Sequence, residues 1–262
     1  AFTIANSRLT SSILAVSSDE KNKLIDFVHG LDAYDDNGNT IFEQEKRSWI
    51  LGSFIHSRPY IIHYKNRTVI YAGSNDGMLH AFNDYPVGGS GDGEELWAFI
   101  PPSLLGKLKE LHTNNPGEFV DGSPKAYITY NASGDVTKAI LVFGLRRGGD
   151  YYYALDVTDP LVPKYLWRIY KNKNSDFREL AQTWSAPIIG KVPYGDQTSN
   201  PPGHKWVVIF GAGYDTNQDY LNPAPTDSTG RGIYMADLFT GAAVWRQSYQ
   251  WGLTNMSHSI PS

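Results

Sequence analysis

The 262-residue sequence contains no cysteine. This absence excludes disulfides, thiolate metal sites and haem attached through a Cys-x-x-Cys-His motif. The sequence also lacks any apolar run near the ~20 residues that a membrane-spanning helix needs. No signal peptide is visible at Ala1. We therefore expect a mature or trimmed chain without haem and without a membrane span.

Positive charge is also scarce. The formal net charge is −4, the sequence pI is about 6.0, and charged residues make up only 19% of the chain. A nucleic-acid-binding protein needs a basic face that neutralises phosphates. We therefore expect no nucleic-acid partner.

Aromatic residues, glycine and proline are abundant. Aromatic residues form 13% of the chain, with 17 Tyr, 25 Gly and 15 Pro. This composition predicts many short strands joined by turns. Residues 1–50 differ, because Ser17-Ser18 can cap a helix and apolar residues from Leu24 to Leu31 share one face. They predict one helix with a break near Gly30, followed by a polar loop.

Twelve strands are predicted from residue 51 onward, in three groups of four. Each strand is an aromatic or β-branched run bounded by turn residues. The groups are 59–64, 68–73, 78–82 and 95–100; then 122–130, 138–145, 151–157 and 164–169; then 185–192, 205–213, 232–238 and 242–247.

The three groups carry the same landmarks in the same order. A Ser and a Pro begin each group, a Gly ends its second strand, an Asn or Asp closes its third strand, and a Trp lies in its fourth. The landmarks are Ser57, Ser123 and Ser185; Gly73, Gly144 and Gly211; Asn83, Asp156 and Asp237; and Trp97, Trp167 and Trp245. A four-stranded repeat predicts an all-β fold, a β-propeller with quinoprotein-like blades. We expect each Trp to pack between blades and to direct its indole N–H to a carbonyl.

The expected organisation is an N-terminal helix and polar loop over residues 1–50 and a propeller portion over 51–262. The blades are expected at about 51–120, 121–182 and 183–256, with the start of a fourth at 257–262. Propellers have about four to eight blades, so three cannot close a ring. The remaining blades are expected on the rest of the protein or on another chain.

Two polar loops have the spacing of calcium loops. The candidate ligands are Asp35, Asn37, Asn39 and Glu43 in the first loop and Asp215, Asn217 and Asp219 in the second. Hard cations take several oxygen ligands at such offsets. Neither loop matches the full twelve-residue pattern, since Thr40 and Tyr220 replace the usual Gly at position six. The alternative is two polar turns whose Asx side chains bond their own backbone.

An ordered set of motifs resembles a known family. The set includes "EKRSWILGSFIHSRP", "YAGSNDGMLHAFN", "GEELWAFIPPSLL", "YYYALDVTDP", "TWSAPIIGKV" and "GRGIYMADLFTG". Together these motifs resemble the propeller domain of PilC/PilY-type type IV pilus biogenesis proteins, over nearly the whole chain. The family's regulatory calcium loop would lie after Ser262, so it is not carried over to this chain.

The resemblance implies a secreted bacterial protein of the cell surface. It implies a role at the pilus tip or in pilus assembly, in adhesion to host or abiotic surfaces, and in calcium-dependent control of pilus extension. The implied partners are pilus subunits or tip proteins. The resemblance implies no enzyme activity, no catalytic residue and no quinone, and calcium is the one cofactor expected.

Two other functions stay open. Quinoprotein dehydrogenases use blades with an Asp, Thr-Gly and Trp motif, here Asp237, Thr240, Gly241 and Trp245. That motif is blade architecture, and function does not follow from fold. The adjacent cysteines common in the alcohol dehydrogenases of that class are absent. The third possibility is a structural subunit of an extracellular filament whose exposed tyrosines form interfaces.

Overall fold

The structure is a computed structural model that describes residues 1–41, 45–84, 93–113, 117–171, 176–199, 201–220 and 226–261. It begins with helices α1 (Ser11–Leu14) and α2 (Ser18–Val28). The predicted helix is confirmed as α2, and the Ser17 hydroxyl caps it by accepting from the Glu20 amide at 3.2 Å. Leu31 was expected on the helix face, but the helix ends before it, and Leu31 forms a β-bridge with Lys46 instead.

Twelve strands form three four-stranded antiparallel sheets, as the repeat predicts. Within each sheet the strands are adjacent in chain order. The first sheet comprises β1 (Tyr60–Tyr64), β2 (Arg67–Gly73), β3 (Leu79–Asp84) and β4 (Glu95–Phe99). The second comprises β5 (Lys125–Tyr130), β6 (Val136–Gly144), β7 (Tyr151–Asp156) and β8 (Lys164–Tyr170). The third comprises β9 (Ile188–Pro193), β10 (His204–Gly211), β11 (Gly232–Asp237) and β12 (Ala243–Ser248).

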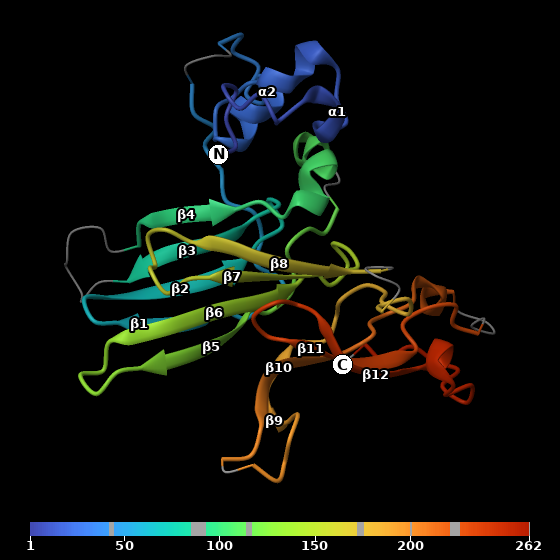
Figure 1. The fold of residues 1–262 in the computed structure, drawn as a ribbon. Helices are drawn as coiled ribbons and strands as arrows, with labels where there is room; N and C mark the ends of the chain where they lie inside the picture. The colour runs from blue at the N-terminus through green and yellow to red at the C-terminus, as the bar shows by residue number, and fades with distance from the viewer. Residues whose placement is uncertain are drawn as a thin grey trace.

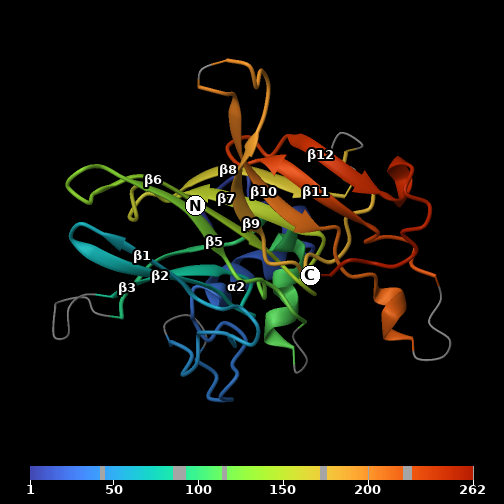
Figure 2. The same cartoon turned by 90° about the horizontal axis from the view of Figure 1, so that it is seen from below.

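The sheets stack through two apolar cores, with the second sheet in the middle (Figures 1 and 2). Successive residues of a strand point to opposite faces. On β6, Leu141 and Phe143 therefore enter the core shared with the first sheet, whereas Val142 enters the core shared with the third. Tyr71 and Tyr234 fill the far sides of these two cores, and both are fully buried. Such stacking of separate four-stranded sheets is the arrangement of propeller blades.

In every sheet, the pairing of the third and fourth strands contains a β-bulge at the same place. The register shifts between Ala81 and Phe82, between Ala154 and Leu155, and between Met235 and Ala236. A bulge increases local twist and re-aims neighbouring side chains. The landmark Trp of each fourth strand pairs with a residue at this bulge.

A 3₁₀ helix that was not predicted, η1 (Pro102–His112), lies between the first two sheets. Pro102 occupies the first helical position, where proline is favoured, and the 3₁₀ helix buries Leu104 and Leu108. This helix packs with α1 and α2 in a third apolar cluster (Figure 1). Two short 3₁₀ segments follow later, η3 (Thr216–Asp219) and η4 (Tyr249–Trp251). None of the helices in the described residues is long and apolar enough to cross a membrane.

The end of the chain returns to the third sheet. Ile260 forms a β-bridge with Gly213, and its amide donates to the carbonyl of Gly230 at 2.8 Å. The start of a fourth blade at 257–262 stays a prediction.

Candidate functional site

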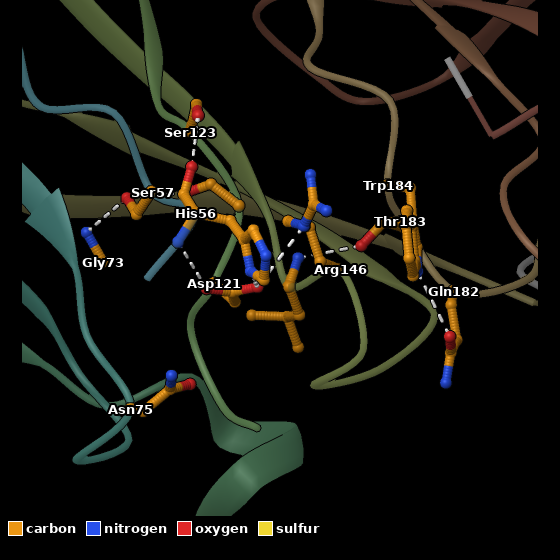
Figure 3. A network of polar contacts seen from close by, with 12 residues as sticks. His56, Ser57, Gly73, Asn75, Asp121, Ser123, Arg146, Gln182, Thr183 and Trp184 are labelled. Atoms are coloured by element: carbon orange, nitrogen blue, oxygen red, sulfur yellow. Dashed lines mark hydrogen bonds and ion pairs between the residues drawn. The ribbon is translucent and has the colours of Figure 1, made fainter. Parts of the chain in front are cut away.

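The three sheets are joined at the end where their second strands finish. There the β2–β3, β6–β7 and β10–β11 connections meet the segments that lead into each following sheet. Polar side chains from these segments form what we call the junction network, shown in Figure 3. Its main members are His56, Ser57, Asp121, Ser123, Arg146, Thr183 and Trp184.

The landmark glycines allow this junction to form. A Cβ atom on Gly73 would lie 2.4 Å from the carbonyl oxygen of Val120, in the segment leading to the second sheet. A Cβ atom on Gly211 would lie 2.4 Å from the carbonyl oxygen of Ile260. Such distances are far below van der Waals contact, so the approach of each segment requires glycine at the end of the second strand.

The landmark serines bind these glycines. The Ser57 hydroxyl accepts from the Gly73 amide at 2.9 Å and donates to the carbonyl of Gly122 at 3.1 Å. Ser185 accepts from Gly211 in the same way at 3.2 Å. Ser123 differs, because its hydroxyl accepts from the amide of Arg58 at 3.0 Å. Ser123 therefore occupies the same place in the repeat as Ser57 and Ser185 but does not make the equivalent hydrogen bond.

His56, Asp121 and Arg146 lie at the centre of Figure 3 and point toward one another. The buried Asp121 carboxylate accepts from the His56 backbone amide at 3.1 Å and contacts His56 Nδ1 at 2.6 Å. Arg146 Nε forms an ion pair with the same carboxylate at 3.3 Å. Asp121 thus joins the segment before the first sheet to the β6–β7 connection.

An aromatic–arginine stack, formed by Arg146, Arg147, Trp184 and Tyr214, extends this network. The Trp184 and Tyr214 rings stack with centroids 4.7 Å apart. The guanidinium carbon of Arg146 lies 4.5 Å from the centroid of the Trp184 ring, and that of Arg147 lies 5.1 Å from it. These are cation–π distances. Arg146 has φ 52°, a left-handed conformation that is uncommon outside glycine.

A second charged cluster lies on the outer face of the first sheet. His80 is 3% exposed, and its ring contacts Glu95 at 2.5 Å and both carboxylate oxygens of Asp76 at 3.0 Å. Burial alone lowers the pKa of His80, but the hydrogen bonds from Asp76 and Glu95 outweigh it and raise the pKa to about 9. The imidazole is therefore charged at neutral pH. It borders a cavity of about 730 Å³ that Phe2, Val28 and other apolar residues line.

The first candidate calcium loop is ordered by its own Asx side chains. Asp35 Oδ1 accepts from the Thr40 amide at 3.1 Å, and Asn37 Oδ1 accepts from the Asn39 amide at 3.0 Å. Asn39 Oδ1 accepts from the Ile41 amide at 2.8 Å. Thr40 has φ 66°, so it adopts the left-handed turn that glycine usually provides at position six. Glu43 lies outside the described residues.

In the second candidate loop, the three predicted ligands point to different partners. Asp215 is buried, and its carboxylate accepts from the amides of Asn217, Ser228 and Thr229 at 2.6 to 3.0 Å. Asp219 accepts from the Tyr214 hydroxyl at 2.7 Å and faces Arg147 at 3.3 Å. Asn217 donates to the carbonyl of Thr226 at 3.5 Å.

No group of three or more His, Asp or Glu side chains is placed to hold a metal ion, as far as the described residues extend. Calcium binding by either loop stays a prediction, and its remaining oxygen donors would be amides and backbone carbonyls.

The landmark Trp residues link each sheet to the next. The Trp97 indole donates to the carbonyl of Pro160 at 2.7 Å, and that of Trp167 donates to the carbonyl of Leu238 at 2.8 Å. These bonds confirm the prediction for two of the three. Trp245 is 44% exposed, because no sheet follows it in the described residues.

Residues 60–248 match the family model described as the PilY1 beta-propeller domain. This range runs from the first residue of β1 to the last residue of β12. The chain belongs to the PilY1 β-propeller family. The predicted family and the predicted propeller architecture are thereby confirmed.

Curated relatives in this family are named as pilus proteins. The chain is 31% identical over 198 residues to the type IV pilus biogenesis factor PilY1 of Pseudomonas aeruginosa, which covers 74% of this chain and 14% of that protein. It is 35% identical over 153 residues to a PilY1 homolog of Xylella fastidiosa, covering 58% of this chain and 11% of the homolog. The chain thus spans a small part of the length of these relatives.

A solved structure is also similar. The crystal structure of the P. aeruginosa PilY1 C-terminal domain has a TM-score of 0.47 and 30% sequence identity, covering 70% of this chain and 30% of that one.

Sequence reasoning also missed the Glu179–Arg231 pair and Trp184 in this PilY1-family chain. The buried pair Glu179–Arg231 was not predicted, because its partners lie far apart in sequence and no motif marks them. Trp184 was also missed, although a signal existed. It occupies the third position before the landmark Pro, where the other units carry His56 and Asp121, so it departs from the repeat.

Proposed function

We propose that this chain is the propeller portion of a type IV pilus biogenesis factor that acts without catalysis. The observation that carries the proposal is the family match, which spans all three sheets. We further propose that the protein acts outside the cell at the pilus, with pilus subunits or tip proteins as partners. Adhesion to a host or abiotic surface is part of the same proposal.

The absence of catalysis is supported by the roles of the residues that a quinoprotein enzyme would share. Asp237 Oδ1 accepts from the Thr240 amide at 2.9 Å and from its hydroxyl at 3.0 Å, which closes the β11–β12 turn. Gly241 has φ 66°, and a Cβ there would lie 2.8 Å from the Trp167 ring. The motif is fully accounted for by blade construction.

We also propose that further blades cover the outer faces of the first and third sheets. Trp245 supports this, since it holds the position from which Trp97 and Trp167 bind the following sheet. Val192, Tyr194 and Met235 surround it in an open hollow of about 340 Å³. A single exposed aromatic is common, so the support is that Trp245 repeats the position of Trp97 and Trp167 beside an apolar hollow.

The pilus role can be tested in the full protein of the host bacterium. Gly73→Val places a side chain against the Val120 carbonyl and disrupts the junction of two blades. We expect loss of surface pili and of surface attachment. The control is Gly190→Ala, where a Cβ meets nothing within 4 Å. Normal piliation with Gly73→Val, despite a disrupted propeller, would contradict the proposal. Dye-linked dehydrogenase activity in the purified protein would instead support the quinoprotein alternative.

Calcium binding is proposed for the first loop. The support is the alternate spacing of Asp35, Asn37 and Asn39, together with the left-handed turn at Thr40. The Asx hydrogen bonds of this loop are those of the alternative, a polar turn. Titration calorimetry of the chain with Ca²⁺ tests it. Asp35→Ala should abolish binding at this loop. Asp36→Ala removes the same charge from a position that the loop pattern does not use, so binding should persist. Equal behaviour of the two variants would reject the site.

A further inference from the structure

We propose that Arg147 supplies the cation of the second loop, so that its guanidinium takes the place that a calcium ion would occupy. The proposal concerns the segment from Asp215 to Asp227 and does not depend on calcium at the first loop. The argument depends on which group, a cation or a hydrogen-bond donor, contacts each carboxylate of this segment.

Two of the three carboxylates are saturated by groups of the chain itself. Asp215 is 4% exposed and holds Ser228 and Thr229 through its second oxygen. Asp227 is 2% exposed and accepts from the Gln218 amide group and from the Ser259 backbone. A buried carboxylate with several N–H donors is satisfied without a metal. These two residues therefore shape the loop, and their carboxylates need no metal ion as a partner.

Asp219 is the carboxylate that remains, and Arg147 faces it. Arg147 Nη2 lies 3.3 Å from Asp219 Oδ1, and Nη1 lies 3.4 Å from Oδ2, so two nitrogens face two oxygens. The hydrogen bond from Tyr214 and the contact with Arg147 both hold the pKa of Asp219 below its usual range. A fork of this kind matches a carboxylate in geometry as well as charge.

The neighbouring sheet holds Arg147 in place. It belongs to the β6–β7 connection, 72 residues before Asp219. Its guanidinium carbon lies 5.1 Å from the Trp184 ring centroid and 5.7 Å from that of Tyr214. The Tyr214 backbone is paired in turn with Gln182, two residues before Trp184. Aromatic faces and a paired backbone thus position the cation where the loop needs it.

The two loops therefore differ although their spacing is the same. Asp-x-Asn-x-Asn begins the first and Asp-x-Asn-x-Asp the second. No arginine or lysine is paired with the side chains of Asp35, Asn37 or Asn39 among the described residues. A dication brought to the second loop would lie beside a guanidinium, and like charges at such range repel. The repulsion and the lost ion pair both oppose calcium.

Terbium luminescence tests the assignment, because a Tb³⁺ ion at Asp219 would lie beside the Tyr214 ring and be excited through it. The full chain carries Asp35→Ala throughout, which silences the first loop. In that background we expect no luminescence that depends on Asp219. Arg147→Ala should produce a several-fold increase that Asp219→Asn abolishes and that added Ca²⁺ competes away. Arg147→Gln repeats the measurement if the alanine variant fails to fold.

Arg168→Ala is the matched control, because Arg168 also lies over a tyrosine ring, that of Tyr170 at 5.2 Å. It should leave the luminescence at the background level. Luminescence that depends on Asp219 while Arg147 is present would overturn the proposal, since the loop would then bind metal beside its arginine. The proposal would also be overturned if neither Arg147 variant showed luminescence that depends on Asp219. In that case the guanidinium would not be the group that excludes the ion.

Discussion

At the scale of single residues, the strongest constraints are charges buried between segments distant in sequence. His80 lies between Asp76 and Glu95 on the outer face of the first sheet, and Arg231 lies against Glu179 beside the third. A buried charge persists only when it is paired and hydrogen-bonded. Each cluster therefore makes its own contribution to folding, and the two respond to different perturbations.

The His80 cluster predicts a loss of stability at alkaline pH. Its folded pKa of about 9 exceeds the unfolded value, so its contribution is complete below the unfolded pKa and disappears as pH rises through 9. A shift of this size corresponds to about 3 kcal/mol at most. Denaturant unfolding between pH 6 and 10 should show a decline that His80→Gln lacks. Parallel curves for the two proteins would contradict the coupling.

The Glu179–Arg231 pair predicts a large effect of a single substitution. Arg231 Nε and Nη2 each lie 3.0 Å from a Glu179 oxygen, and their side chains are 8% and 2% exposed. Arg231→Met leaves a buried, unpaired carboxylate, which costs about 3–5 kcal/mol. Guanidinium unfolding measures it. The control is Lys65→Ala, which breaks a solvent-exposed pair with Asp135 and should change stability little. Similar effects of both would mean that the buried pair is not held as described.

At the scale of the elements, each blade is built from the same few contacts. The glycine of the second strand, the bulge and the tryptophan recur in all three sheets, and the bond from the glycine amide to the serine hydroxyl recurs in the first and third. The glycines matter most, because at them the backbone of the next segment lies against the strand. Glycine is required at these positions for a steric reason. This requirement can be tested separately from the general tendency of glycine to weaken strands.

A pair of Gly→Ala substitutions tests this steric requirement. At Gly73 the new methyl would lie 2.4 Å from the Val120 carbonyl, so the junction must open, at a cost of about 1–3 kcal/mol. At Gly190, also in a strand, the methyl meets nothing within 4 Å. Alanine makes the unfolded chain less flexible, so the free energy of unfolding should rise by about 0.5 kcal/mol. Midpoints of thermal unfolding should move in opposite directions. A shift of both in the same direction would reject the argument.

The elements were predictable from sequence, whereas much of the site was not. All twelve strands follow from short aromatic and β-branched runs, because burial between sheets demands those residue types locally. The helix η1 was not predicted, because Gly106 interrupts its apolar spacing, although Pro102 holds a favoured first position. The contrast between the two candidate loops also escaped. Their spacing is the same, and the difference is Arg147, which only the packing of neighbouring sheets brings near.

At the scale of the whole molecule, the three sheets form an open stack. Trp97 and Trp167 bind across the two closed boundaries, and Trp245 lies on the free face. A stack of blades is stabilised mainly by neighbour contacts. The contribution of a landmark tryptophan to stability therefore depends on whether a following sheet is present, and not on its own blade.

Trp→Phe substitutions measure this dependence, because they keep the ring and remove the indole N–H. Trp167→Phe leaves the buried Leu238 carbonyl without its donor and should cost about 1–3 kcal/mol in the 262-residue chain. Trp245→Phe should cost little there, since its side chain is 44% exposed. In the full-length protein, Trp245→Phe should become as costly as Trp167→Phe, because a further blade would bury the indole. Urea unfolding of both variants in both proteins decides it. If Trp245→Phe remains harmless in the full-length protein, no blade covers the third sheet, and a partner protein or solvent faces it instead.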